Sequence, residues 1–317
     1  MSLRNSKVVI VGAGNVGSTT AYSIINQGIC EDICLIDNRS EVALGQALDM
    51  RDAVFFMNRN MKVHTGGYEE CSDADIVIVT AAAPMPKDTT DRLSLLRPTL
   101  HVVRQVVQDV MASGFNGIFI VVSNPVDIMT YYTWRVSGLP RRRVIGSGTY
   151  LDTARVSRLL SDMYDLAPAS VEAYVLGEHG DSEIVSWNSA TIGGKRVDDV
   201  LRDNASRTNG VTRDDLRKKT VAAGWDIFSR KGNTCYGIAA STTSIAKSIL
   251  FDENRIMPVS VCLSGQYGID GTYLSVPTIV DHTGAKEIVE IALEEDELNA
   301  LQKSAEILHS LYSQLDE

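Results

Sequence analysis

Residues 7–17 read Lys7-Val8-Val9-Ile10-Val11-Gly12-Ala13-Gly14-Asn15-Val16-Gly17, and this stretch decides the fold. The apolar run predicts a buried strand, the glycines a tight turn, and the residues after them a helix. A second apolar run over residues 33–36 ends at Asp37, which follows the last glycine by 37 − 17 = 20 residues. Three glycines alone are weak evidence, because a turn before a helix needs no ligand. The strand, turn, helix and carboxylate together form a coherent dinucleotide fingerprint.

The glycines Gly12, Gly14 and Gly17 would allow a pyrophosphate to approach the helix N-terminus. Free backbone N–H groups and the helix dipole favour anions there. Asp37 would accept hydrogen bonds from the adenosine ribose, and its charge would repel the extra phosphate of NADP. The sequence therefore predicts a dinucleotide site, with NAD as the cofactor.

The order of apolar runs along the chain predicts two domains of different character. The first half alternates short Val/Ile runs with helical stretches, which is typical of a parallel sheet with crossover helices. Strands are expected near 7–11, 33–37, 61–64, 76–80, 118–122 and 144–146, and helices near 15–27, 40–57 and 92–113. After about Ser147 we expect a helix containing Val156, strands at 171–175, 259–263 and 272–280, and helices at 212–230, 237–251 and 285–314. The predicted fold class is α/β, with an N-terminal Rossmann doubly wound parallel sheet (1–146, NAD-binding) followed by a mixed α+β catalytic and substrate domain (147–317).

Composition argues against several classes of partner. The net charge of −10 disfavours nucleic acid, because binding a phosphate backbone requires clustered Lys and Arg. No apolar stretch approaches the roughly 20 residues of a membrane span, and no signal peptide precedes the first strand. The five cysteines show no paired spacing and nothing resembles a metal cluster, so we expect no metal, small core cysteines and a cytoplasmic protein.

Three further segments carry polar residues suited to chemistry. Asp152 and Arg155 are three residues apart and share one helical face. His179 lies in the glycine-flanked stretch 177–182, and residues 123–127 follow an apolar strand, where ligands collect in open α/β sheets. Each alone has a simpler interpretation: a surface ion pair, a turn histidine and an Asn-Pro turn.

Together these segments resemble the L-lactate/malate dehydrogenase family, and the lactate branch more than the malate branch. The resemblance covers nearly the whole chain and rests on motifs that occur in order, namely Gly12-Ala13-Gly14-Asn15-Val16-Gly17, Ser123-Asn124-Pro125-Val126-Asp127, Gly146-Ser147-Gly148-Thr149, Leu151-Asp152-Thr153-Ala154-Arg155 and Gly177-Glu178-His179-Gly180-Asp181-Ser182.

The resemblance implies roles for four charged residues. His179 would be the general acid/base that gives a proton to the substrate carbonyl oxygen as hydride reaches the carbon. Asp152 would orient the imidazole and favour its charged form. Arg155 would hold the substrate carboxylate in a bidentate contact, and Arg92 would stabilise charge developing on the oxygen.

The same resemblance implies the remaining contacts. Asn124 would touch the substrate oxygen and help to place the nicotinamide, and Thr234 would put a hydroxyl beside the substrate. The implied cofactor-binding residues are Gly12, Gly14, Val16, Gly17, Asp37, Tyr68, Ala82, Ala83, Ser123, Asn124 and Ser147.

The substrate loop, residues 83–92, departs from the family pattern. Lactate dehydrogenases usually carry glutamine after the alanine-proline, and malate dehydrogenases arginine, whereas this chain has Met85 there. The spacing to Arg92 is one residue longer, so Pro86 is the alternative specificity position. Neither residue can pair with a second carboxylate, which disfavours oxaloacetate. We expect L-lactate/pyruvate as substrates, with a branched 2-hydroxy acid of the 2-hydroxyisocaproate type as the alternative and malate as the less favoured one.

Regulation and assembly follow from the same comparison. Relatives activated by fructose 1,6-bisphosphate use an arginine and a histidine where this chain has Ser157 and Glu172, so we expect no such activation. The resemblance implies a homo-oligomer, a tetramer or a dimer, acting on a small-molecule 2-oxo or 2-hydroxy acid. The hypothesis from a different class is a non-catalytic NAD-binding sensor, which would have no use for a proton donor such as His179.

Overall fold

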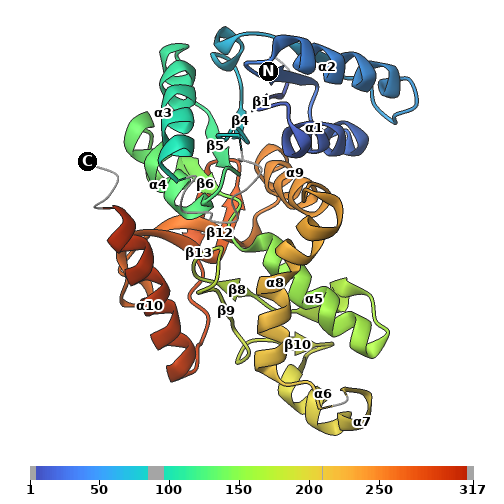
Figure 1. Cartoon of the computed structure of the whole chain (residues 1–317), viewed down its shortest axis with the longest axis vertical. Helices are drawn as coiled ribbons and strands as arrows, with labels where there is room; N and C mark the ends of the chain where they lie inside the picture. The colour runs from blue at the N-terminus through green and yellow to red at the C-terminus, as the bar shows by residue number, and fades with distance from the viewer. Residues whose placement is uncertain (1–4, 85–95, 209, 313–317) are drawn as a thin grey trace. The chain divides into compact units, whose positions relative to one another are not determined.

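The computed structural model describes residues 5–84, 96–208 and 210–312. The chain forms two compact units, and its elements are labelled in Figure 1. Unit 1 comprises Met1–Ser147, Thr234–Arg255 and Ile279–Glu287, and unit 2 comprises Gly148–Asn233, Ile256–Thr278 and Ile288–Glu317. Two segments from the second half of the sequence therefore belong to unit 1.

Unit 1 is built on a parallel sheet. Its strands are β1 (Lys7–Val11), β2 (Asp32–Ile36), β3 (Lys62–Thr65), β4 (Ile76–Val79), β5 (Ile118–Val121) and β6 (Val144–Gly146), in the order β3-β2-β1-β4-β5-β6. Every neighbouring pair in this series is parallel. Strands β1, β4, β5 and β6 are buried throughout, as their unbroken apolar sequences require. The chain winds outward in both directions from the β1/β4 pair, so the predicted doubly wound sheet is confirmed.

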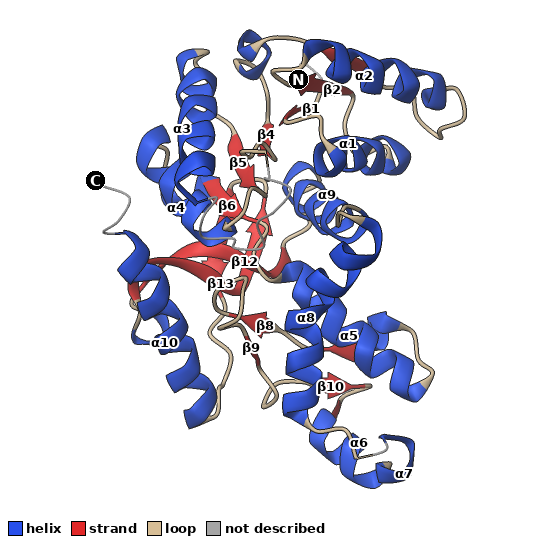
Figure 2. Cartoon of the chain, in the orientation of Figure 1, coloured by secondary structure: helices blue, strands red, loops and turns tan. Residues whose placement is uncertain are grey.

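Helices pack against this sheet within unit 1. They are α1 (Asn15–Gln27), α2 (Ser40–Val54), α3 (Leu96–Ala112), α4 (Val126–Ser137) and α9 (Tyr236–Leu250), with short 3₁₀ turns at η1 (Tyr68–Cys71) and η3 (Arg141–Arg143). Helix α3 buries one face of residues spaced three and four apart, including Leu100, Val103 and Val107. Helix α9 packs on α1, which explains why residues 234–255 join unit 1. Figure 2 shows α3 and α4 on one side of strands β4–β6 and α1 with α9 on the other.

Unit 2 combines helices with short strands. Its helices are α5 (Tyr150–Tyr164), α6 (Val197–Asp203), α7 (Ala205–Thr208), α8 (Arg213–Lys231) and α10 (Glu295–Tyr312), with 3₁₀ turns at η4 (Pro168–Ser170) and η5 (Gln266–Gly268). Its short strands are β7 (Val171–Glu172), β8 (Val175–Leu176), β9 (Ile184–Val185), β10 (Thr191–Ile192) and β11 (Lys195–Arg196), and the long strands β12 (Arg255–Ser264) and β13 (Asp270–Asp281) follow. Val156 and Leu160 of α5, Val175 of β8, Trp187 and Leu216 form part of its apolar core.

Several predicted elements need correction. The helix expected over 285–314 is wrong at its start, because Gly284–Ile288 forms strand β14 and the helix begins at Glu295. The turn before β14 explains this: Thr283 donates both its N–H and its hydroxyl to Asp281, and Gly284 has a φ of 104°. The strand expected over 171–175 is two short strands, β7 and β8. Helix α4 was not predicted. No described helix is long and apolar enough to cross a membrane.

Candidate active site

One edge of the unit 1 sheet gathers most of the predicted cofactor residues. Gly12 follows β1, Asp37 follows β2, Ala82 follows β4, Ser123 follows β5 and Ser147 follows β6. Because these strands are parallel, the residues after them meet at the same edge of the sheet. This edge includes the β1/β4 switch point, where ligands bind in open α/β folds.

The glycine turn has the geometry that a pyrophosphate needs. Gly12 has a φ of 108°, and a Cβ there would lie 2.6 Å from Thr80 Oγ1. A Cβ on Gly17 would lie 1.8 Å from the Gly12 carbonyl oxygen, so only glycine lets helix α1 pass so close to the turn. A Cβ on Gly14 would meet nothing within 4 Å, and no side chain caps the helix N-terminus that begins there. The N-terminus of α1 thus has no side-chain cap and open space around the Cα of Gly14, an arrangement that favours an anion, and these residues fit NAD.

Asp37 supports this turn from the end of β2. Its Oδ2 accepts a hydrogen bond from the Ala13 N–H at 2.7 Å, and its Oδ1 accepts one from the Arg39 N–H at 2.9 Å. The carboxylate is therefore fixed beside the glycine turn, where the sequence predicts ribose recognition. Nearby, burial above all, with the carboxylates of Asp109 and Asp37 adding, raises the pKa of Tyr68 to about 12, so its hydroxyl is a neutral donor.

The residues after β4, β5 and β6 are ordered by backbone contacts. The Ser123 hydroxyl donates to the Ala81 carbonyl at 2.6 Å, and the Ser147 N–H donates to the Val121 carbonyl at 2.8 Å. The Ala83 N–H donates to Thr99 Oγ1 at 3.4 Å, and Asn124 is exposed at the end of this edge. Thr80, which the sequence analysis missed, donates to the Gly12 carbonyl at 2.9 Å and holds the turn from β4.

Unit 2 brings together the predicted histidine, aspartate and arginine. His179 Nδ1 lies 2.6 Å from Asp152 Oδ2, and Arg155 Nη1 donates to Asp152 Oδ1 at 2.6 Å. The Asp152 side chain is 1% exposed, against 11% for Arg155 and 21% for His179. One buried carboxylate therefore joins both groups, and Nδ1 is the ring nitrogen committed to it.

Residues 177–183, called here the histidine turn, connect β8 to β9 and are held by contacts with β13 and α10. Gly177 exchanges two backbone hydrogen bonds with Ser275 of β13 and has a φ of 91°. Ser304 of α10 accepts from the Glu178 N–H at 2.9 Å, and its hydroxyl lies 2.8 Å from that of Ser182. A Cβ on Gly177 would lie 2.9 Å from the Ser304 hydroxyl. These contacts place His179 against helix α5.

Helix α5 presents Asp152 and Arg155 from its first turns. The Thr153 hydroxyl accepts from the Val175 N–H at 2.9 Å, which ties the helix start to β8. Asp152 lies in the first turn, where a negative charge is favoured by the helix dipole. Gly224 of α8 leaves room for the guanidinium, because a Cβ there would lie 3.3 Å from Arg155 Nη2.

The charge of Asp152 is set by opposing effects. Burial would raise the pKa of its carboxyl, but the charges and hydrogen bonds of His179 and Arg155 outweigh burial and lower that pKa. Asp152 is therefore ionised, and it favours the charged form of the imidazole. This matches what a proton donor to a carbonyl oxygen requires.

A fourth ionisable residue of this cluster was missed by the sequence analysis. Glu183 directly precedes β9 and is 3% exposed. In the sequence it follows a glycine-rich polar turn, where a glutamate is usually solvated, so nothing pointed to it. Its side-chain carboxyl lies beside Asp152 and His179.

Several predicted site residues are not placed. Arg92, Met85 and Pro86 lie outside the described residues. Thr234 is described: it is partly buried, precedes α9 in the sequence and belongs to unit 1.

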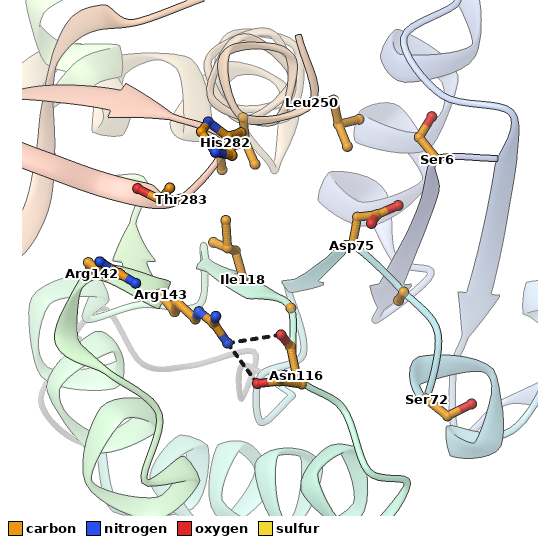
Figure 3. A pocket seen from close by; sticks show the side chains of 13 residues that line it. Ser6, Ser72, Asp75, Asn116, Ile118, Arg142, Arg143, Leu250, His282 and Thr283 are labelled. Atoms are coloured by element: carbon orange, nitrogen blue, oxygen red, sulfur yellow. Dashed lines mark hydrogen bonds between the residues drawn. The ribbon is translucent and has the colours of Figure 1, made fainter. Parts of the chain in front are cut away.

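A cavity of about 580 Å³ lies elsewhere in unit 1, and Figure 3 shows its lining. It is formed at the opposite, amino ends of the strands, by residues such as Ser6, Asp75 and Asn116. Arg143 spans part of it and donates to Asn116 Oδ1 at 2.6 Å. None of the predicted cofactor or catalytic residues that the structure describes lines this cavity.

Comparison with known proteins gives the same assignment as the geometry. Residues 6–146 match the NAD-binding domain of lactate/malate dehydrogenase, and residues 149–316 match its alpha/beta C-terminal domain. The chain belongs to the lactate/malate dehydrogenase family, as its motifs predicted.

Individual relatives are similar over nearly their whole length. L-lactate dehydrogenase 3 of Bacillus cereus is 47% identical over 308 residues, which are 97% of each chain. The crystal structure of the minor L-lactate dehydrogenase from Enterococcus mundtii in its ligands-bound form matches with a TM-score of 0.92 at 43% identity, covering 98% of each chain. A lactate dehydrogenase from a Medee basin deep-sea metagenome library matches with a TM-score of 0.93 at 39% identity, covering 99% of this chain and all of that one.

Proposed function

We propose that this protein is an NAD-dependent L-lactate dehydrogenase that interconverts pyruvate and L-lactate. The observation that carries the proposal is the histidine, aspartate and arginine cluster of unit 2, with both side-chain contacts to Asp152 at 2.6 Å. The similarity to L-lactate dehydrogenases over nearly the whole chain supports the same substrate pair.

The chemistry divides between the cofactor and the chain. When bound, NADH would supply hydride to the carbonyl carbon of pyruvate, and NAD⁺ would accept hydride from the hydroxyl-bearing carbon of lactate. His179 gives the matching proton to the substrate oxygen through Nε2, because Nδ1 faces Asp152. Asp152 stabilises the imidazolium before the transfer, and Arg155 binds the substrate carboxylate. Pyruvate gains one hydride and one proton, which balances its reduction to lactate.

The remaining roles are proposed from the family resemblance. Arg92 polarises the carbonyl, Asn124 and Thr234 contact the substrate, and the edge residues of unit 1 bind NAD. We assign cofactor binding to residues 1–146 and substrate binding mainly to 147–317. The family resemblance makes Met85 or Pro86 the specificity position, and neither carries a charge, so aliphatic 2-oxo acids somewhat longer than pyruvate are accepted and oxaloacetate is disfavoured.

Assembly, location and regulation are also inferred. The enzyme works as a homo-oligomer, a tetramer or a dimer, in the cytoplasm. Fructose 1,6-bisphosphate does not activate it, because Glu172 is an exposed acid and Ser157 is buried and uncharged. A phosphate group would find no cation at either position.

The test is the loss of reduced-nicotinamide absorbance when purified protein is mixed with NADH and pyruvate. General acid catalysis contributes about 10²- to 10⁴-fold, so His179→Asn should lose at least 100-fold in turnover and still bind NADH. His309→Asn changes an exposed histidine on α10 and serves as the control. Binding of NADH without turnover in the unchanged protein would favour the sensor hypothesis instead.

A further inference from the structure

Glu183 is a buried carboxyl that the proposed chemistry does not use. Its side chain is 3% exposed, and Oε1 has no hydrogen-bond partner among the described residues. The residue is fixed by its own backbone, since its N–H donates to the Gly180 carbonyl at 3.3 Å and β9 begins at the next position. A buried carboxylate without hydrogen bonds is costly, whereas a neutral carboxylic acid is much less so.

Within the part of the chain that the structure describes, the charged groups around Glu183 leave it without a counter-ion of its own. An oxygen of Glu183, an oxygen of Asp152 and a ring nitrogen of His179 all lie within 4.8 Å of one another. Arg155 also faces it, but Asp152 already holds both Arg155 and His179. Arg217 of α8, a further cation that acts on Glu183, lies 3.5 Å from Asp214.

The protonation of Glu183 follows from this arrangement. Burial first, and the charge of Asp152 second, raise the pKa of Glu183 to about 9. The cations His179, Arg155 and Arg217 lower it by less. Near neutral pH the residue is therefore neutral.

We propose that Glu183 is a positioning residue kept as a neutral acid beside the His179–Asp152–Arg155 cluster, and that its ionisation at alkaline pH weakens binding of the substrate carboxylate at Arg155. This inference rests on the proposed function.

The charges of the cluster give the reason. When the imidazole is protonated, the three described residues Asp152, Arg155 and His179 sum to −1 + 1 + 1 = +1, which favours a monocarboxylate such as pyruvate. When the imidazole is neutral, as lactate oxidation requires, these three residues sum to zero. Ionisation of Glu183 lowers either sum by one, which weakens the attraction for the lactate carboxylate and competes for Arg155.

The first test measures protonation without any activity. Between about pH 5.5 and 8.5 an unfolded glutamate is ionised while the folded Glu183 is protonated, so its contribution to stability falls as pH rises. Glu183→Gln, which has the shape of the neutral acid, should therefore raise Tm relative to wild type, and by more at pH 8.5 than at pH 5.5. Glu306→Gln, at an exposed position on α10, should show no such trend. A Glu183→Gln variant that loses stability increasingly toward alkaline pH, or shifts Tm equally at both, would show an ionised Glu183 and overturn the proposal.

The second test follows the KM for L-lactate between about pH 8 and 10, the direction in which a neutral imidazole is required. In wild type the KM for L-lactate should rise about tenfold over this pH interval, while kcat changes little. A factor of this size is expected when one negative charge is added a few ångströms from the bound carboxylate. The rise should be absent in Glu183→Gln and retained in Glu306→Gln. An equal rise in all three proteins would refute the proposed effect on carboxylate binding. A protein that oxidises no 2-hydroxy acid at all would refute the proposed function, while the Tm comparison would still decide the state of Glu183.

Discussion

Replacing Asp152 by asparagine is the most informative perturbation, because this one buried carboxylate touches both His179 and Arg155 at 2.6 Å. Asparagine keeps the size of the side chain and removes its charge. The imidazolium then loses a charge-assisted hydrogen bond, while neutral imidazole loses much less. We expect the variant to bind and reduce pyruvate efficiently only at lower pH than wild type.

The magnitude follows from the bond that is lost. A hydrogen bond between charged groups contributes about 1.5–3 kcal/mol, and 1.4 kcal/mol corresponds to tenfold. Near neutral pH, kcat/KM for pyruvate should fall by roughly 10- to 150-fold. The midpoint of the pH profile of kcat/KM should move to lower pH by about 1 to 2 pH units. The overall equilibrium is unchanged, so with unaltered cofactor affinity kcat/KM for lactate must fall by the same factor at each pH.

The assay is initial rates in both directions, followed by reduced-nicotinamide absorbance from about pH 5 to 9. Asp162→Asn is the matched control, because Asp162 lies on the same helix, is exposed and pairs with Arg158 at 2.9 Å. It should behave as wild type. A pyruvate profile with its midpoint unmoved and kcat/KM within about threefold of wild type would refute the role of Asp152.

Three further predictions concern the cofactor, regulation and substrate. Wild type should prefer NADH to NADPH, and Asp37→Ser should narrow that preference; equal kcat/KM for both cofactors in wild type would contradict the role of Asp37. Millimolar fructose 1,6-bisphosphate should leave the pyruvate saturation curve unchanged, and a marked shift to lower pyruvate would show that a basic cluster away from Ser157 and Glu172 binds it. Met85→Arg should raise kcat/KM for oxaloacetate relative to pyruvate, since it returns a counter-charge for the second carboxylate; a wild type that already prefers oxaloacetate would support malate as the substrate.

The parallel sheet was predictable because most of its strands are short apolar runs bounded by turn residues, although β3 (Lys62–Thr65) has only Val63 buried. The expected strands agree with β1 to β6 to within two residues at each end. The same reasoning failed at β14, where Lys286 and Glu287 resemble the start of a polar helix. There the turn from Asp281 to Gly284 decides the structure, and that turn depends on side-chain hydrogen bonds that periodicity does not reveal.

The pairing of Asp152 with Arg155 was readable from their spacing, since residues three apart on a helix are neighbours. The contact of Asp152 with His179 was expected only from the family resemblance, because the two residues lie 27 positions apart. What brings them together is the anchoring of the histidine turn to Ser275 and Ser304, two residues about 100 or more positions further along the chain. Neither serine belongs to a recognisable motif.

Asp152 and Glu183 show why residue type alone does not determine charge. Both are buried acids in one cluster, and burial alone would raise the pKa of each. Asp152 lies within hydrogen-bond distance of both cations, so its pKa is lowered; Glu183 reaches neither and faces the charge of Asp152, so its pKa rises to about 9. Two carboxyls with divergent pKa values can serve two roles, one as the fixed counter-ion of the imidazole and one as a neutral neighbour. The difference in pKa depends on which carboxyl forms the hydrogen bonds to Arg155 and His179. That is a property of the folded cluster, and no local sequence pattern contains it.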